Sequence, residues 1–387
     1  MNVMVSCEFR FFQTPDGNVW TSSSFQYDFW LRYLSSFEQV TVLARVKNVP
    51  TAKSHWQLSN GRNVTFFNLP YYVGMLGLIK SSITLFYRLI QASRFTGLFL
   101  CRVPSQNATA LTQILRFKNQ AYALEVVGDP YDVFSSGVGG KLAKILREIS
   151  TKALVKQCQH AIGVSYVTAH YLQKRYPAGK ETYQSHYSSI MLDDTQIVNQ
   201  ARAFCRPARK LLFVGSLNQL YKAPDILLSA FAKLVVQDNS YQLTLLGTGK
   251  YLPTLKQQAS DLHIAENVHF IGEVKSNQVT NYLQDADLFV LPSRTEGLPR
   301  AIIEAMAQAL PCVGSTAGGI PELLAPEFCV PPDDVTSLYE RLSELCNNKE
   351  ELTQQSAVNL AKSKNYHCDV LTEKRYNFYQ KLRELSQ

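Results

Sequence analysis

A chain of 387 residues exceeds the size of one ordinary hydrophobic core, so its length predicts two domains. With 46% apolar and 18% charged residues, the chain has the composition of a globular protein. Its eight cysteines form no Cys-x-x-Cys pair, which argues against structural zinc and disulfides and favours a reducing compartment.

The net charge of +8 is placed unevenly along the chain. Residues 1–195 hold 20 Lys and Arg but only 11 Asp and Glu, so the whole positive excess lies there. No nucleic-acid motif with interleaved aromatic residues appears in this half, and we expect no nucleic acid as a partner. Anionic lipid or a pyrophosphate-bearing acceptor fits the charge better, and an ordinary solvated surface is the alternative.

The first half alternates between strand and helix patterns. Residues 1–7 resemble a strand and lack the basic and apolar regions of a secretory signal, so we expect a cytoplasmic protein. Residues 8–20 form an aromatic loop with a turn at Asp16-Gly17. The remaining predicted strands cover residues 40–46, 98–103, 121–127 and 161–164, and the predicted helices cover residues 25–37, 141–158 and 168–175.

Residues 63–79 carry no charge over 17 positions. The stretch is shorter than the ~20 residues that a membrane span needs, and Pro70, Gly74 and Gly77 interrupt it. A strand, an apolar loop and a helix are therefore predicted. Tyr71, Tyr72, Met75, Leu76 and Ile79 either form an interfacial face or pack into the core, and core packing is the favoured alternative.

Residues 195–209 are polar and read as an interdomain linker. A buried strand at 211–215 follows, then a loop with Lys222 and a helix at 225–236. A second strand at 243–246 ends in Gly247-Thr248-Gly249, and a third is predicted at 268–272. Asp285-Ala286-Asp287 joins a helix end to a buried strand, so we interpret both carboxylates as structural and expect no metal site.

The most informative stretch runs from residue 286 to residue 324. It reads as strand 288–291, a polar loop, helix 301–309, strand 312–314 and a second tight loop at 317–322. Pro299 precedes the helix where its missing N–H costs little. This is a parallel βα arrangement, and both loops leave the carboxyl ends of strands, where open α/β sheets bind ligands.

The two loops predict a site for an anion and for hydroxyl groups. The free amides near Gly297 and Leu298, ahead of the helix, favour phosphate. Glu296 at the loop and Glu304 one turn into the helix face the same crevice, where carboxylates suit hydrogen bonds from sugar hydroxyls. The alternative is that Glu296 caps the helix and Glu304 is an ordinary solvated side chain.

Glu296 to Glu304, followed by Gly318-Gly319-Ile320-Pro321-Glu322, resembles the donor-site signature of the retaining glycosyltransferases of family four. The resemblance covers roughly residues 211–324. It implies an α/β protein with the GT-B fold, in which two Rossmann-like domains face each other and the C-terminal domain holds the donor site. The expected domains are residues 1–195 and 196–368, with the last helix, residues 369–387, crossing back to the first domain.

The resemblance also implies roles for individual residues. A Lys at position 222 would bind the donor diphosphate, although an Arg that the family often has after the Gly is Ser216 here. Asp129 stands nearest to the place of the family's catalytic histidine, but Asp-Pro is also a common turn opening. The implied catalytic residues are Glu296, Lys222 and Asp129; the implied donor-binding residues are Gly215, Ser216, Lys222, Gly247, Gly249, Val274, Glu296, Gly297, Leu298 and Glu304.

The implied activity is metal-independent, retaining hexosyl transfer from a nucleoside-diphosphate sugar, a co-substrate, to a glycan or lipid-linked acceptor, with no other cofactor. An enzyme of this kind would serve polysaccharide or glycoconjugate biosynthesis, in the cytoplasm or bound peripherally to the anionic inner face of the membrane. The alternatives are a sugar-nucleotide epimerase or hydrolase on the same fold and a non-catalytic scaffold that binds sugar nucleotide.

Overall fold

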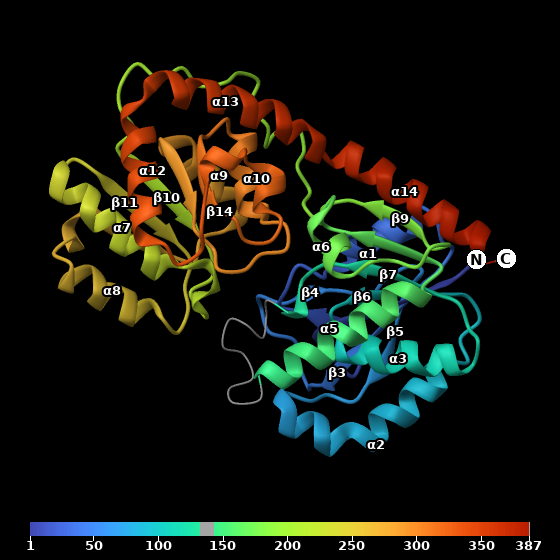
Figure 1. Ribbon diagram of the computed structural model, residues 1–387. Helices are drawn as coiled ribbons and strands as arrows, with labels where there is room; N and C mark the ends of the chain where they lie inside the picture. Colours follow the sequence, from blue (N-terminus) through green and yellow to red (C-terminus); the bar gives the residue numbers. More distant parts are fainter. Residues whose placement is uncertain (132–142, 387) are drawn as a thin grey trace.

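The computed structural model describes residues 1–131 and 143–386 and has two lobes, each built on a parallel β-sheet with helices on both faces (Figure 1). The start of the helix predicted at 141–158 lies outside the described residues. Two lobes of this kind are the GT-B fold, as predicted. The carboxyl ends of their strands carry the loops considered below.

The N-terminal sheet has seven parallel strands in the order β5-β3-β1-β6-β7-β8-β9, with β2 and β4 added antiparallel. Its central strands are buried on both faces, which explains their almost continuous apolar sequence. The strands are β1 Val3–Gln13, β2 Val19–Thr21, β3 Val40–Asn48, β4 Gln57–Leu58, β5 Val64–Leu69, β6 Leu98–Val103, β7 Tyr122–Val126, β8 Gly163–Tyr166 and β9 Tyr183–His186.

The prediction of a loop at residues 8–20 was wrong. Strand β1 continues to Gln13 and turns back into β2, with Phe12 paired to Trp20. The turn itself was read correctly, because Gly17 adopts φ 83° and Asp16 accepts a hydrogen bond from the amide of Asn18 at 3.1 Å. Aromatic side chains at alternate positions, which looked like loop content, are the side chains of a hairpin.

Helices cover the N-terminal sheet on both faces (Figure 1). They are α1 Tyr27–Leu34, α2 Gly74–Ala92, α3 Gln106–Phe117, α5 Ala143–His160 and α6 Tyr171–Arg175. The strand, loop and helix expected from residue 63 onward are confirmed as β5 and α2. Tyr72 is buried and donates to Asn107 Oδ1 at 3.0 Å, whereas Met75, Leu76 and Ile79 are exposed, so core packing holds for Tyr72 but is wrong for these three.

The C-terminal sheet has the strand order β12-β11-β10-β13-β14-β15, the 3-2-1-4-5-6 order of a dinucleotide-binding fold. Strands β10 and β13 lie side by side where the order reverses. The strands are β10 Lys210–Val214, β11 Gln242–Leu246, β12 Val268–Gly272, β13 Leu288–Leu291, β14 Cys312–Ser315 and β15 Cys329–Val330. Those predicted at 268–272 and 288–291 are confirmed to the residue.

The helices of the second half are α7 Pro224–Gln237, α8 Leu252–Asp261, α9 Ser276–Asp285, α10 Arg300–Ala307, α11 Ile320–Leu323, α12 Val335–Asn347, α13 Lys349–Ser363 and α14 Cys368–Leu385. Helix α14 leaves the C-terminal lobe and lies along the N-terminal one (Figure 1). Its Phe378 stacks on Tyr183, with 6.0 Å between ring centroids. The predicted return of the last helix to the first domain is confirmed.

Candidate active site

Lys222 and Glu296, 74 residues apart in sequence, form an ion pair at the carboxyl ends of β10 and β13. Lys222 ends a single 3-10 turn, Leu220–Lys222, after β10, and Glu296 lies in the loop between β13 and α10. The distance from Lys222 Nζ to Glu296 Oε1 is 2.7 Å, and Ser293 Oγ donates to the same carboxylate oxygen at 2.9 Å. Sequence analysis identified these two residues separately, and the structure shows that they are in direct contact.

Both partners of this pair are largely buried, with side chains 14% and 9% exposed. Burial alone would lower the pKa of Lys222, but the carboxylate of Glu296 outweighs it and leaves the pKa of Lys222 above its ordinary value. The lysine is thus a fixed cation at neutral pH. Because a buried ion pair is weak evidence for stability, this pair is a candidate for a role in ligand binding.

Arg294 fixes the position of the Lys222 turn. Its guanidinium donates two hydrogen bonds to Asp225 at the start of α7, at 2.9 and 2.7 Å, and it also binds Asp333. The amide of Arg294 donates to Tyr221 O at 2.7 Å, so the loop after β13 is tied to the turn after β10. This fork geometry suits a planar guanidinium and explains why the position carries Arg.

The Gly-Gly-Ile-Pro-Glu loop packs directly on the Glu296 loop. Gly318 adopts φ 58°, and a Cβ there would lie 1.8 Å from Glu296 O. The amide of Gly319 donates to Gly297 O at 2.7 Å. Only glycine fits such a close approach, so this pair supports the backbone that presents the Glu296 side chain.

Around this pair lie groups suited to an anion. The amides of Gly297 and Leu298 donate no hydrogen bond to any described residue and precede α10. Arg300, exposed at the first position of α10, acts electrostatically on both Lys222 and Glu304. Sequence analysis did not identify Arg300, a second cation near Lys222. Its position just after Pro299, at the helix start, was the available signal.

Glu304 lies one turn into α10 and borders a small hollow with Val279 and Thr280 of α9. Burial raises the pKa of this carboxyl, and the cations of Arg300 and Lys222 offset only part of the rise. Val274 lies two residues before α9, the helix that borders the hollow beside Glu304.

Gly215, Gly247 and Gly249 allow the strand-end loops to pack closely. A Cβ on Gly247, at φ 137°, would lie 1.9 Å from Gly215 O, and one on Gly249 would lie 2.1 Å from Asn218 N. A Cβ on Gly215 would lie 2.3 Å from Lys222 Cδ. Ser216 Oγ accepts from the amide of Asn218 at 3.3 Å. These glycines therefore make room for the loop and the lysine stem.

Asp129, which follows β7 in the N-terminal lobe, is buried and fully engaged. Its carboxylate pairs with Arg175, accepts from the Tyr176 hydroxyl and accepts from the amide of Tyr131 at 2.9 Å. The last contact is the local hydrogen bond of an Asp turn. These contacts support the turn interpretation, whereas the catalytic role of Asp129 stays a prediction.

The two lobes meet across the site. A Cβ added to Gly297 would lie 3.6 Å from Val127 O and 3.8 Å from Gly128 Cα, and both residues follow the carboxyl end of β7. Beside it, the Glu322 carboxylate accepts from the amides of Ala169, His170 and Tyr171 at 2.5, 2.9 and 2.7 Å. The sequence placed Glu322 in a motif, but only the fold shows that it caps α6 of the other lobe.

Asp285 and Asp287 hold the start of β10. Asp287 Oδ2 accepts from the amides of Arg209 and Lys210, each at 2.9 Å, and Asp285 pairs with Lys210 Nζ at 2.8 Å. These carboxylates sit at the amino end of the sheet, whereas Lys222 and Glu296 sit at its carboxyl end. The contacts agree with the structural interpretation of the Asp-x-Asp sequence.

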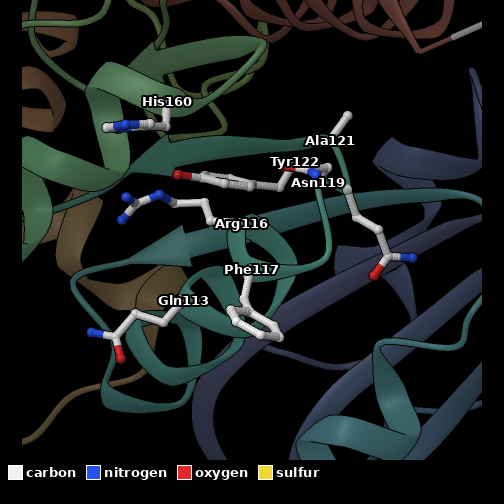
Figure 2. Close-up of a pocket in the computed structure, with 8 residues that line it drawn as sticks. Gln113, Arg116, Phe117, Asn119, Ala121, Tyr122 and His160 are labelled. Carbon is white, nitrogen blue, oxygen red and sulfur yellow. The ribbon is translucent and has the colours of Figure 1, made fainter.

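A broad open hollow elsewhere on the N-terminal lobe is separate from this site. It is lined at the amino end of β7 by Tyr122, with Arg116 and Phe117 from α3 and His160 from the end of α5 (Figure 2). His160 Nδ1 lies 2.8 Å from Lys156 O one helical turn away, so this histidine is engaged within its own helix. The hollow therefore lies at the amino end of β7, whereas Val127 follows its carboxyl end.

Comparison with known proteins agrees with this geometry. Residues 208–348, which contain both loops, match the family described as Glycosyl transferases group 1. This match lies within the C-terminal half of the chain. The chain's match to Protein CapJ of Staphylococcus aureus is 28% identical over 336 residues, covering 85% of this chain and 83% of CapJ. The O-antigen biosynthesis glycosyltransferase WbnH of Escherichia coli is 34% identical over 147 residues, covering 38% and 40% of the two chains.

The same fold occurs in a solved structure, that of Anabaena HepE in complex with UDP. It aligns with a TM-score of 0.64 at 14% identity, covering 99% of each chain, and this likeness concerns the fold. Together the matches support a glycosyltransferase of polysaccharide or glycoconjugate biosynthesis and do not favour an epimerase, a hydrolase or a scaffold. Within the described residues, no helix has the length and apolar character that a membrane crossing requires.

Proposed function

We propose that the protein is a retaining, metal-independent hexosyltransferase of family four that uses a nucleoside-diphosphate sugar. The carrying observation is the buried Lys222–Glu296 pair at the carboxyl ends of β10 and β13, facing the edge of the other lobe. A cation for a diphosphate and a carboxylate for hydroxyl groups stand side by side there. The bound UDP of HepE supports a nucleoside diphosphate as the leaving group.

Binding of the donor exchanges partners at this pair. The diphosphate takes Lys222 from Glu296, and Glu296 then accepts hydrogen bonds from the sugar. Gly297 and Leu298 add backbone amides, and Arg300 adds a second cation. These donors gain strength as negative charge collects on the leaving diphosphate, so they stabilise the transition state more than the ground state. Glu304 and Val274 contact the ribose and the base.

In the chemical step, the bond from the anomeric carbon to the diphosphate oxygen breaks. The acceptor hydroxyl oxygen bonds to the same carbon on the same face, and its proton passes to the departing phosphate. The diphosphate therefore serves as the base, and the proton balance closes without a protein carboxylate. This mechanism requires no metal, because Lys222, Arg300 and the amides balance the developing charge.

The acceptor is a glycan or a lipid-linked glycan, as the name of WbnH and the surface of α2 support. Leu76, Ile79, Ile83 and Phe86 recur every three or four residues along α2 and, with the adjacent Tyr87, form one apolar stripe. These five side chains are 56–86% exposed. The helix has no acidic residue. Such a face, with Lys80 at its side, suits an anionic membrane surface that presents a lipid-linked acceptor.

A donor screen tests the proposal. UDP-, GDP- and ADP-sugars are compared by thermal shift, and a donor at 100 times its Kd should add about 2.7 kcal/mol of stability. The donor that binds is then supplied with candidate acceptors, and NMR of the product reports the anomeric configuration. Retention supports the proposal, whereas inversion, or release of free sugar with every acceptor, overturns it.

A further inference from the structure

A second, small pocket lies at the carboxyl ends of β7 and β8 in the N-terminal lobe and is strongly cationic. Three guanidinium groups line it: Arg32 from α1, Arg102 from β6 and Arg375 from α14. The lining contains one carboxylate, Glu125, so these groups leave two positive charges in excess. Hydroxyl groups of Ser165, Ser188 and Ser189 complete the polar lining.

Glu125 is already saturated with donors. One of its oxygens accepts from Arg102 and from the Tyr33 hydroxyl at 3.0 Å. Its other oxygen accepts from the hydroxyls of Tyr187 and Tyr379 at 3.0 and 2.7 Å. The carboxylate is thus fully used by Arg102 and three tyrosines and offers no hydrogen bond to the other two arginines.

Arg375 is only 3% exposed and has neither a hydrogen bond nor an ion pair with any described residue. Its guanidinium lies over the face of Tyr187, 5.2 Å from the ring centroid, and interacts electrostatically with Glu125 without a hydrogen bond. Arg32 likewise has no carboxylate partner and donates to Phe29 O. Burial and the neighbouring cations of Arg375 and Arg102 together lower the pKa of Arg32. A buried cation without a partner is costly, and folds retain one where a ligand completes it.

The pocket faces the donor loop. Val127 and Val167 belong to its lining, and the position of a Cβ on Gly297 would lie 3.6 Å from Val127 O and 3.8 Å from Val167 Cγ2. A group seated in the pocket is therefore adjacent to the loop that carries Glu296. The free volume, about 10 Å³, admits one water-sized atom, which matches a single oxygen of a larger group held at the mouth.

We propose that this pocket binds an oxyanion of the acceptor, a phosphate or carboxylate oxygen, through Arg375 and Arg32. Guanidinium forks suit both oxyanions. The identification of the bound group as part of the acceptor rests on the proposed transfer reaction, whereas the anion site itself rests on the contacts of Arg375 and Arg32. It assigns the acceptor to the class of anionic glycans or glycosyl phosphates, and makes α14 a part of the acceptor site.

The test measures thermal shifts of the full chain with inorganic phosphate, and with acetate as the carboxylate, each against sodium chloride at matched ionic strength. Phosphate or acetate should stabilise the wild type, and Arg375→Met and Arg32→Gln should each reduce that shift at least tenfold in apparent affinity. Lys222→Ala should retain it. Arg32 is only partly buried, whereas Arg375 is 3% exposed, so the Arg32 variant keeps the test valid if Arg375→Met does not fold.

UDP provides the complementary arm. Its shift should fall in Lys222→Ala and persist in Arg375→Met, so the two sites separate. An anion shift that survives in Arg375→Met and Arg32→Gln, or one that is lost only in Lys222→Ala, overturns the proposal, as does the absence of any anion shift. If UDP causes no thermal shift while the phosphate and acetate shifts behave as expected, the proposed donor chemistry is rejected and the anion site stands.

Discussion

At the scale of single residues, Lys222 carries the strongest expectation. Lys222→Ala should lower kcat/KM by the equivalent of about 2–4 kcal/mol, because a contact that strengthens in the transition state is lost. The matched control is Lys210→Ala, which removes a half-exposed cation at the other end of β10 and should change kcat/KM little. Unchanged kcat/KM in Lys222→Ala would rule out the assigned role.

Glu304 makes a prediction about stability and pH. Burial raises the pKa of Glu304 above its ordinary value of 4.5, so the folded chain binds this proton more tightly than the unfolded chain. Stability therefore falls as pH rises from about 4.5 through the raised pKa, and the loss is complete above it. Glu304→Gln should stabilise the ligand-free protein at neutral pH but not at pH 4, as measured by urea unfolding. A variant that is less stable at neutral pH would contradict this.

Asp285 and Asp287 predict the response to chelation. Both side chains bind the start of β10, so the proposed mechanism uses no metal at this Asp-x-Asp sequence. Activity should survive EDTA, and adding Mn²⁺ or Mg²⁺ should not increase it. Asp285→Asn, at an exposed ion pair, should retain full activity. Reversible loss of all activity on chelation would reject metal independence.

The sequence identified the site residues better than their contacts. Gly318-Gly319 and the two glutamates could be identified because spacing within one loop and one helix is local. The Lys222–Glu296 pair and the three-amide cap by Glu322 join residues far apart in the chain, and no local pattern encodes such contacts. Arg375 was missed for another reason: an arginine within a polar-rich helix looks solvated, and only the docking of α14 shows that it is buried.

At the scale of elements, buried strands were the most predictable. Apolar runs of four to six residues that turn residues bound, such as those of β6 and β13, indicate a buried strand. The hairpin of β1 and β2 was missed because several of its side chains are only partly buried, so polar and aromatic residues are mixed there. The stripe on α2 was underestimated, because three of its members, Ile83, Phe86 and Tyr87, lie beyond the uncharged stretch of residues 63–79.

Helix α2 predicts salt-sensitive binding to anionic vesicles. It lies on the outer edge of the N-terminal lobe, away from the C-terminal lobe (Figure 1). Full insertion of one large apolar side chain contributes about 1.5–3 kcal/mol. The double variant Leu76→Ser, Ile83→Ser should therefore weaken co-sedimentation at least about tenfold. Higher salt should weaken binding of the wild type, because exposed charges are screened beyond about 8 Å at physiological ionic strength.

The control for this measurement is Val236→Ser, which removes an equally exposed apolar side chain, 88% exposed, from α7 in the other lobe. It should bind vesicles as the wild type does. Neutral vesicles should bind the wild type less than anionic ones. Absence of the wild type from both pellets at low salt would reject the membrane proposal and favour a soluble acceptor.

At the scale of the molecule, Glu322 couples the two lobes. Its carboxylate accepts hydrogen bonds from three amides at the start of α6, where the first N–H groups of a helix have no partner within the helix. All three hydrogen bonds cross the boundary between the lobes. A hydrogen bond to a charged group contributes about 1.5–3 kcal/mol, enough to shift an equilibrium between closed and open lobes about tenfold or more. Closure also brings Gly297 against Val127, so the two halves of the site form together.

Glu322→Ala should therefore open the molecule without unfolding it. Small-angle scattering should give a larger radius of gyration than for the wild type, while circular dichroism stays unchanged. Transfer should lose kcat/KM, because donor and acceptor sides are aligned less often, whereas UDP binding to the C-terminal lobe alone should persist. The control is Glu327→Ala, an exposed carboxylate five residues away that forms no ion pair with any described residue of the N-terminal lobe; it should leave scattering and rate as they are. Equal scattering from Glu322→Ala and the wild type would show that α14 and the loop contacts hold the lobes closed without this carboxylate.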